Sequence, residues 1–164
     1  MRLYFAGPLF TQAERDWNRR IAARLVAIGH DVFLPQQEVH NLASLQADAI
    51  FALDVGGVRS ADALVAVLDG ADADSGTSFE CGLAFALNIP IIVLRTDFRG
   101  GGDALPGQAL ATINLMLSQA AAAIVAQPDP TTTEDDLISL LREALDSLPI
   151  TPRIPARNVL TPIQ

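Results

Sequence analysis

The sequence has a single cysteine and few basic side chains. Cys81 has no second cysteine with which to pair, so an internal disulfide framework is excluded. The chain carries 11 basic against 19 acidic residues, a formal net charge of −8. Such a charge opposes binding to the polyphosphate backbone of nucleic acid. The sequence therefore predicts no nucleic-acid partner.

Long apolar runs are also missing, although 50% of the residues are hydrophobic. No run approaches the roughly 20 residues that a membrane-spanning helix needs. The start, MRLYFAGPLF, lacks the pattern of a secretory signal peptide. We therefore expect a soluble, cytoplasmic protein that does not associate with membranes. The high apolar content leaves room for an oligomer interface as well as a core.

A length of 164 residues suits one domain better than two. We expect residues 1–148 to form this domain. Residues 149–164 form a tail whose four prolines exclude a continuous helix.

Short apolar runs alternate with helical patterns along the domain. The runs predict strands at residues 2–6, 31–34, 63–68, 91–94 and 121–126. The helical patterns lie at residues 11–29, 42–53 with an interruption near Gly56 and Gly57, 77–88, 109–119 and 131–148. Residues 95–107 and 127–130 are predicted to be a loop and a turn. This alternation favours an α/β fold, a flavodoxin-like doubly wound five-stranded parallel sheet of order 2-1-3-4-5 with helices on both faces.

An acidic turn between two of these strands leads to Glu80. In open α/β sheets, ligands bind outside the carboxyl ends of the strands, where this turn lies. The simplest interpretation is structural, because Thr77 and Glu80 form a T-x-x-E capping-box pattern and Asp74 suits a helix start. However, the small residues Cys81 and Gly82 leave space beside the Glu80 carboxylate, which could act as a nucleophile or acid.

Other chemistries have little support in the sequence. His30 and His40 are too far apart to form a local ligand pair, and the acidic turn lacks the rest of a calcium loop. Phosphate-binding glycine motifs and a serine nucleophile elbow are missing, and Cys81 lies within an apolar helix. We therefore predict no metal and no cofactor. Tyr4, on the strand expected beside the one that leads to Glu80, is placed to orient its carboxylate.

Taken together, several motifs resemble the nucleoside 2-deoxyribosyltransferases over residues 2–118. They are LYFAGPLF followed by Thr11 and Glu14, then Asp54, Asp62, DSGTSFECGLA from Asp74, and RTDFR before NLML at Asn114. The resemblance implies an enzyme that exchanges the base of a 2′-deoxynucleoside for another free purine or pyrimidine base. It also implies a dimer-based homo-oligomer with active sites shared between subunits, and no cofactor.

The resemblance assigns roles to individual residues. Glu80 would be the nucleophile, forming a covalent glutamyl-deoxyribosyl intermediate, so that two displacements retain the anomeric configuration. Tyr4 would hydrogen-bond this nucleophile. Asp54 and Asp74 would face the base, and one of them would donate a proton to the leaving nitrogen.

The remaining assignments concern the pocket walls and the neighbouring subunit. Gly7 and Phe10 would line the pocket near the base. Asn114 lies in the region that, in this family, a neighbouring subunit contributes to the sugar hydroxyls. If sites are shared in this way, an isolated monomer is expected to be inactive.

Two alternatives share the fold. The related deoxynucleoside 5′-monophosphate N-glycosidases hydrolyse their substrates to base and sugar, and hold phosphate with a loop rich in serine, arginine and glycine. This chain has the apolar Pro8, Leu9 and Phe10 there, which favours an unphosphorylated nucleoside. The other alternative is a non-catalytic nucleotide-binding module, which predicts ligand binding without turnover.

Overall fold

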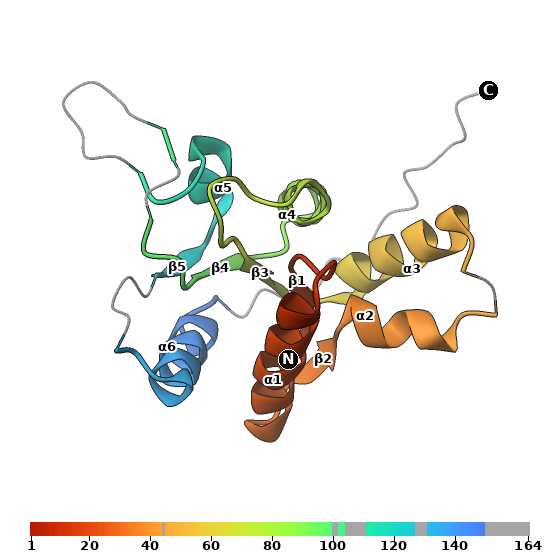
Figure 1. Cartoon of the computed structure of the whole chain (residues 1–164), viewed down its shortest axis with the longest axis horizontal. Coiled ribbons are helices and arrows are strands. Elements are labelled where there is room, and N and C mark those ends of the chain that lie inside the picture. The colour runs from red at the N-terminus through yellow and green to blue at the C-terminus, as the bar shows by residue number, and fades with distance from the viewer. Residues whose placement is uncertain (44, 100–101, 104–110, 127–130, 150–164) are drawn as a thin grey trace.

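A computed structural model describes residues 1–43, 45–99, 102–103, 111–126 and 131–149. Five strands form one all-parallel sheet in the order β2-β1-β3-β4-β5, as predicted (Figure 1). The strands are β1 (Arg2–Ala6), β2 (Asp31–Phe33), β3 (Ala63–Val67), β4 (Ile91–Arg95) and β5 (Ala123–Ala126).

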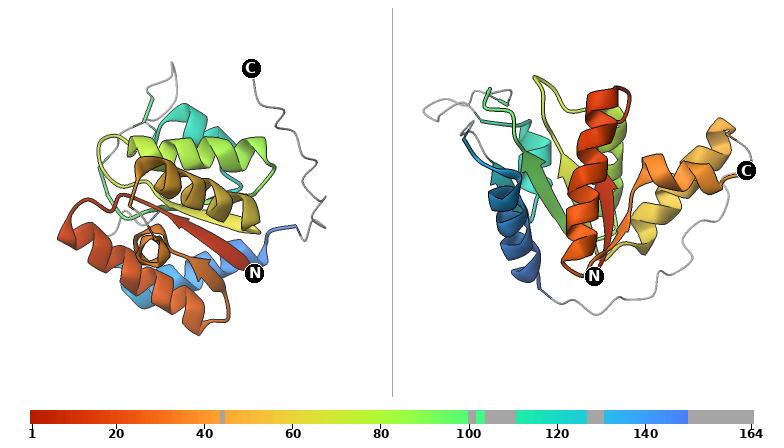
Figure 2. Two further views of the ribbon diagram at one scale, coloured as in Figure 1. Left: turned by 90° about the vertical axis from the view of Figure 1, so that its right-hand side faces the viewer. Right: turned by 60° about the horizontal axis from the view of Figure 1, so that its bottom comes forward.

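Helices cover both faces of this sheet, which confirms the doubly wound fold class. Figure 2 shows α3 and α4 on one side of the sheet and α1 and α6 on the other. The helical elements are α1 (Gln12–Ala27), α2 (Pro35–Glu38), the 3-10 turn η1 (Val39–Asn41), α3 (Ala47–Ser60), α4 (Ser75–Ala86), α5 (Leu115–Ala120) and α6 (Glu134–Asp146). None of these described helices is long and apolar enough to cross a membrane.

The central strands are apolar on both faces because each face is covered by helices. In β1, Leu3 and Phe5 pack into the core cluster of α1 and α6. Tyr4 and Ala6 point the other way, into the cluster that includes residues of α3 and α4. The alternation along β1 thus places the tyrosine on the α3 and α4 side.

The start of α1 follows the predicted capping box. Thr11 Oγ1 accepts a hydrogen bond from the Glu14 N–H, and the Glu14 carboxylate accepts one from the Thr11 N–H. Gly29 follows the helix with a φ of 98°, a left-handed conformation that favours glycine. The helix start and end are therefore both encoded locally.

Two other predicted helix starts were wrong. Helix α4 begins at Ser75, and Asp74 caps it by accepting the Thr77 N–H at 2.8 Å. Thr77 therefore lies inside the helix, and Glu80 has no part in a capping box. At α6 the capping pair is Thr133 with Asp136, two residues beyond the expected start at Thr131.

The interruption predicted at Gly56 and Gly57 was also wrong, because α3 runs through both glycines to Ser60. A Cβ atom at position 57 would lie 2.7 Å from Phe33 Cε1. This glycine therefore serves close packing of α3 against the sheet. Pro35 ends β2 as expected, but it also occupies the first turn of α2, where its fixed φ suits a helix.

The later part of the chain departs from prediction in two elements. Helix α5 begins at Leu115, within the predicted range 109–119, and β5 begins two residues later than predicted. The predicted turn at 127–130 and most of the predicted tail lie outside the described residues, as do residues 109–110.

Candidate active site

The candidate site lies at the carboxyl ends of β1 and β3, where the chain changes from one face of the sheet to the other. After β1 the chain enters α1, and after β3 it enters α4 on the opposite face. Ligands bind at such a switch point because the two diverging loops leave a crevice between them.

Tyr4 and Glu80 meet at this point, as the sequence predicted. The Tyr4 hydroxyl donates a 2.6 Å hydrogen bond to Glu80 Oε1. The Tyr4 ring is fully buried and stacks on Phe33, with 5.3 Å between ring centroids. Burial raises the pKa of Tyr4, as does the neighbouring Glu80 carboxylate, so the phenol keeps its proton and remains a donor. The tyrosine thereby fixes one oxygen of Glu80.

The charge of Glu80 is set by opposing effects. Burial, together with the charges of Asp54 and Asp74, raises its pKa to about 7, although the hydrogen bond from Tyr4 acts in the lowering direction. Carboxylic acid and carboxylate are therefore both populated near neutral pH. A carboxylate in this position is poorly solvated and is a stronger nucleophile than one in water.

Asp54 joins the pair from α3. Its Oδ1 is buried and has no hydrogen-bond partner among the described residues. Burial raises the pKa of Asp54, which favours its protonated form. A buried polar atom without a partner is costly, and a bound ligand would supply the missing partner. Asp54 is therefore suited to hold a proton for a bound molecule.

Asp74 lies at the start of α4 and has a structural task in addition to any chemical one. Its Oδ2 accepts from the Thr77 N–H at 2.8 Å and from Thr77 Oγ1 at 3.0 Å. Its charge also acts on Glu80, so the two groups are close. Because both hydrogen bonds use Oδ2, Oδ1 has no partner among the described residues and is open to a ligand.

Gly7 and Phe10 lie in the β1–α1 loop (residues 7–10), which follows the tyrosine strand. A Cβ atom at Gly7 would lie 3.1 Å from Val67 Cβ, so the loop passes closely over the end of β3. Phe10, at the other end of the loop, has a side chain that is 70% exposed. Both residues thus follow the carboxyl end of β1, and their place in the wall of a base pocket stays a prediction.

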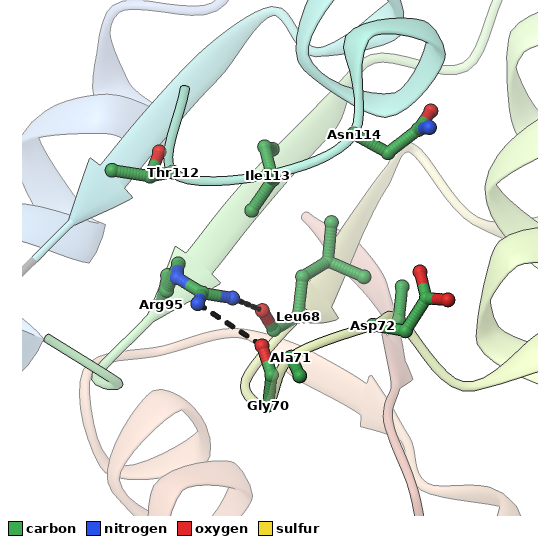
Figure 3. A pocket seen from close by; sticks show the side chains of 9 residues that line it. Leu68, Gly70, Ala71, Asp72, Arg95, Thr112, Ile113 and Asn114 are labelled. Atoms are coloured by element: carbon green, nitrogen blue, oxygen red, sulfur yellow. Dashed lines mark hydrogen bonds between the residues drawn. The ribbon is translucent and has the colours of Figure 1, made fainter. Parts of the chain in front are cut away.

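Among the described residues, Asn114 makes no hydrogen bond to the other predicted site residues. It caps α5, with Oδ1 accepting the Met116 N–H at 2.9 Å. It also lines a small surface hollow between the loops that follow β3 and β4 (Figure 3). Tyr4, Asp54 and Glu80 do not line this hollow. Within one chain, hydrogen bonds and charge effects therefore link Tyr4, Asp54, Asp74 and Glu80, and none of those among the described residues extends to Asn114.

Sequence reasoning missed the supports of these loops. Arg95 is buried, and its guanidinium donates to the carbonyls of Leu68 and Gly70 (Figure 3). Asp69 accepts from the N–H and the hydroxyl of Thr96. Residues 95–107 were expected to be a flexible loop, but Arg95 and Thr96 at its start are tied to the loop after β3. The only sequence signal for these contacts was that Asp69 follows one predicted strand and the segment RTD, from Arg95, follows the next.

The candidate site has little support for metal binding or for a cysteine nucleophile. Within the described ranges, no three His, Cys, Asp or Glu side chains are placed to hold a metal ion. Cys81 is buried, and burial raises the pKa of its thiol to about 12. Little thiolate therefore exists at neutral pH, and the neutral thiol is a poor nucleophile.

Several solved structures resemble this chain, although no curated protein matches its sequence. A conserved protein from Enterococcus faecalis has a similar structure, with a TM-score of 0.66, 30% identity, and coverage of 87% of this chain and 98% of that chain. A 2-deoxyribosyltransferase from Bacillus psychrosaccharolyticus has a TM-score of 0.62 and 20% identity, covering 84% of this chain and 96% of that one. A Leishmania mexicana 2-desoxiribosyltransferase gives 0.62 and 21%, covering 84% and 97%.

The last two structures, at 20% and 21% sequence identity, show only that the fold is shared. The sequence itself matches the family described as Nucleoside 2-deoxyribosyltransferase over residues 3–116, most of the chain. This range contains Tyr4, Asp54, Asp74 and Glu80. The chain therefore belongs to the nucleoside 2-deoxyribosyltransferase family.

Proposed function

We propose that this protein transfers the 2-deoxyribosyl group of a 2′-deoxynucleoside to another free purine or pyrimidine base, a reaction of nucleoside salvage. The observation that carries the proposal is the 2.6 Å hydrogen bond from Tyr4 to Glu80 at the switch point of the sheet. It presents a desolvated carboxylate with one oxygen held and the other, Oε2, available for attack.

In the first half-reaction, Glu80 Oε2 attacks the anomeric carbon of the nucleoside. A carbon–oxygen bond forms as the bond to the base nitrogen breaks, through an oxocarbenium-like transition state. The electron pair leaves with the base, which must gain a proton. Asp54 is suited to supply that proton because burial raises its pKa.

In the second half-reaction, a nitrogen of the incoming base attacks the same carbon and displaces the Glu80 carboxylate. The incoming base loses its proton to Asp54, which returns to its starting state. Two displacements at one carbon retain its configuration. Tyr4 donates its hydrogen bond to Glu80 in both steps and thereby stabilises the carboxylate as it departs.

The other candidate residues bind the substrate. Asp74 Oδ1, Gly7 and Phe10 face the base in this proposal, and no cofactor takes part. Substrates without a 5′-phosphate suit the β1–α1 loop, because Pro8, Leu9 and Phe10 offer a phosphate group no basic or hydroxyl side chain.

We further propose that the active unit is a homo-oligomer in which a neighbouring copy supplies Asn114 to the sugar hydroxyls. Large apolar side chains on α3 and α4 are exposed beside the site. Phe51 and Phe79 are 57% and 56% exposed, with ring centroids 5.9 Å apart, and Phe85 is 62% exposed. Covering this surface with a second copy would bury apolar area that a monomer leaves in water.

Subunit sharing has a direct test in a mixture of two inactive variants. Glu80→Ala removes the nucleophile, and Asn114→Ala removes the group that acts on the neighbour's site. A mixture dissociated and reassembled should regain activity, because some sites then combine an intact Glu80 with an intact Asn114. Reassembly without recovered activity would overturn the shared site.

The test of the reaction itself is to incubate the protein with thymidine or deoxyinosine, with and without adenine, and to separate nucleosides and bases by chromatography. New deoxyadenosine, lost on Glu80→Ala but kept on Glu143→Gln at an exposed site on α6, supports transfer. Free base without a new nucleoside would instead establish hydrolysis. Binding without turnover of either donor would favour a non-catalytic module.

A further inference from the structure

The backbone of the β1–α1 loop is bonded by side chains of the helix that follows it. The Asn18 Nδ2 group donates to the Pro8 carbonyl at 2.9 Å. One nitrogen of Arg15, Nη1, donates to the Leu9 carbonyl at 3.0 Å and to the Phe10 carbonyl at 2.9 Å. Three successive loop carbonyls therefore accept hydrogen bonds from two residues of α1.

The same helix also satisfies a donor of the loop. Glu14 Oε2 accepts from the Phe10 N–H at 2.9 Å, beside the capping bond it makes to Thr11. Pro8 has no N–H to satisfy. Side chains of the first two turns of α1 thus bond the backbone of residues 8–10, and the loop has little freedom left to lose when a ligand binds.

Arg15 occupies a position that helix energetics alone would not favour. It follows directly after the first turn of α1, where the positive end of the helix dipole opposes a cation. The two loop carbonyls offset this, because bonds from a charged donor are stronger than neutral ones. Asn18 is 2% exposed, and a buried amide requires such partners.

This rigid loop ends in an aromatic ring that has little cover. Phe10 is 70% exposed although its N–H and its carbonyl are both bonded to α1. At the other end, Gly7 packs against Val67 at the switch point. A fixed backbone that carries an open, flat, apolar ring just after the carboxyl end of β1 is suited to stack against a planar ligand.

We infer that Arg15 is a positioning residue, which through the loop carbonyls holds the Phe10 ring in place for the nucleobase. The inference rests on the proposed function for the identity of the ligand. Arg15 does not contact the base in this arrangement. Its removal is expected to weaken base binding, because the loop must then be ordered at the moment of binding.

The experiment compares Arg15→Met, which keeps the apolar stem, with Arg15→Lys, which restores a charged donor. Arg19→Met is the matched control, because Arg19 lies on the exposed side of the same helix and, among the described residues, pairs only with Asp16. KM and kcat are measured for the acceptor base adenine, and calorimetry gives the Kd of adenine. Melting temperatures are recorded for every variant.

Arg15→Met is expected to raise both KM and Kd for adenine roughly tenfold, as suits the loss of a charged donor, while kcat stays within about twofold. Arg15→Lys should recover most of this, and Arg19→Met should match the native protein. A lower melting temperature with unchanged KM and Kd would show a merely structural role and overturn the inference.

Phe10→Ala provides a second route to the same question. If Arg15 acts through Phe10, the double variant should bind adenine no more weakly than the weaker single variant. Additive effects, or an unchanged Kd for Phe10→Ala, would overturn the inference even if Arg15→Met does not fold.

The outcome also separates this inference from the proposed function. Transfer by the native protein together with an unaffected Arg15→Met leaves the function standing and removes the role of Arg15. If the native protein binds adenine but transfers no deoxyribosyl group, and Arg15→Met weakens that binding, the proposed function is wrong and the positioning role stands. If the native protein neither transfers nor binds adenine, both are wrong.

Discussion

Gly57 of α3 lies directly against the ring of Tyr4: a Cβ atom at position 57 would be 2.8 Å from Tyr4 Cε2. The missing side chain lets α3 approach β1 closely. Asp54 lies one helical turn before Gly57, and its charge acts on Tyr4 and Glu80. The acidic set of the candidate site thus depends on a glycine that makes no chemical contribution.

Gly57→Ala is therefore expected to destabilise the protein by about 1–3 kcal/mol, the usual cost of adding volume to a packed site. Transfer activity should fall as well, because Tyr4 or α3 must shift. The control is Gly56→Ala on the same helix, where a Cβ atom meets nothing within 4 Å. That change should stabilise the protein by roughly 0.5–1 kcal/mol through helix propensity. Urea denaturation measures both, and equal effects at the two positions would contradict this account.

The pH dependence of activity should report Glu80. Because the attacking group is the carboxylate and its pKa lies at about 7, kcat/KM should rise with pH through about 7. Tyr4→Phe removes a hydrogen bond that acts to lower this pKa, so the midpoint should move to higher pH. At neutral pH, kcat/KM should also fall roughly 10- to 100-fold, the size of one hydrogen bond to a charged group. A midpoint that moves to lower pH in Tyr4→Phe would be incompatible with this geometry.

Stability should depend on the same proton. Folding raises the Glu80 pKa from its ordinary 4.5 to about 7, so the folded chain holds the proton more tightly than the unfolded chain. The contribution to stability is complete below pH 4.5 and is lost as pH rises through about 7. Glu80→Gln escapes this loss, so its free energy of unfolding relative to the native protein should improve between pH 4.5 and 8 by at most about 3 kcal/mol. A difference that stays constant with pH would argue against a buried, titrating Glu80.

Asp54→Asn keeps the shape of the side chain and removes its proton. The expected result is a loss of about 10²- to 10⁴-fold in kcat for natural nucleosides, the usual contribution of a general acid. Donors whose base leaves without protonation should lose much less. Parallel assays with a natural and an activated donor measure this split, and equal losses for both would assign Asp54 to binding alone.

The fold could be predicted well from the sequence because its strongest signals are local. The apolar run before the acidic turn is short and bounded by that turn, which favours a buried strand over a helix, and β3 lies there. Local signals fail where several residues compete for one role. Asp74 and Thr77 are both good helix caps, and only the position of β3 and its loop decides that Asp74 takes the role.

The candidate site was predictable where topology alone brings residues together. Tyr4 and Glu80 meet because the first and third strands are neighbours in this sheet order. Gly57 shows what the sequence cannot show, since a glycine inside a helix indicates a break until the rings of Phe33 and Tyr4 are known to lie against it. Arg95 was missed because its partner carbonyls, at Leu68 and Gly70, lie far from it in sequence.

The sheet order also has a consequence for synthesis on the ribosome. Strand β1 emerges first and can pair with β2 as soon as Phe33 has left the exit tunnel. Its other edge must wait for β3, some thirty residues later along the chain. During that interval a central strand of the finished sheet presents unpaired backbone groups to its surroundings, which favours association with other nascent chains. The arrangement that brings Tyr4 to Glu80 therefore leaves one edge of β1 without its partner strand in this sheet until β3 has been made.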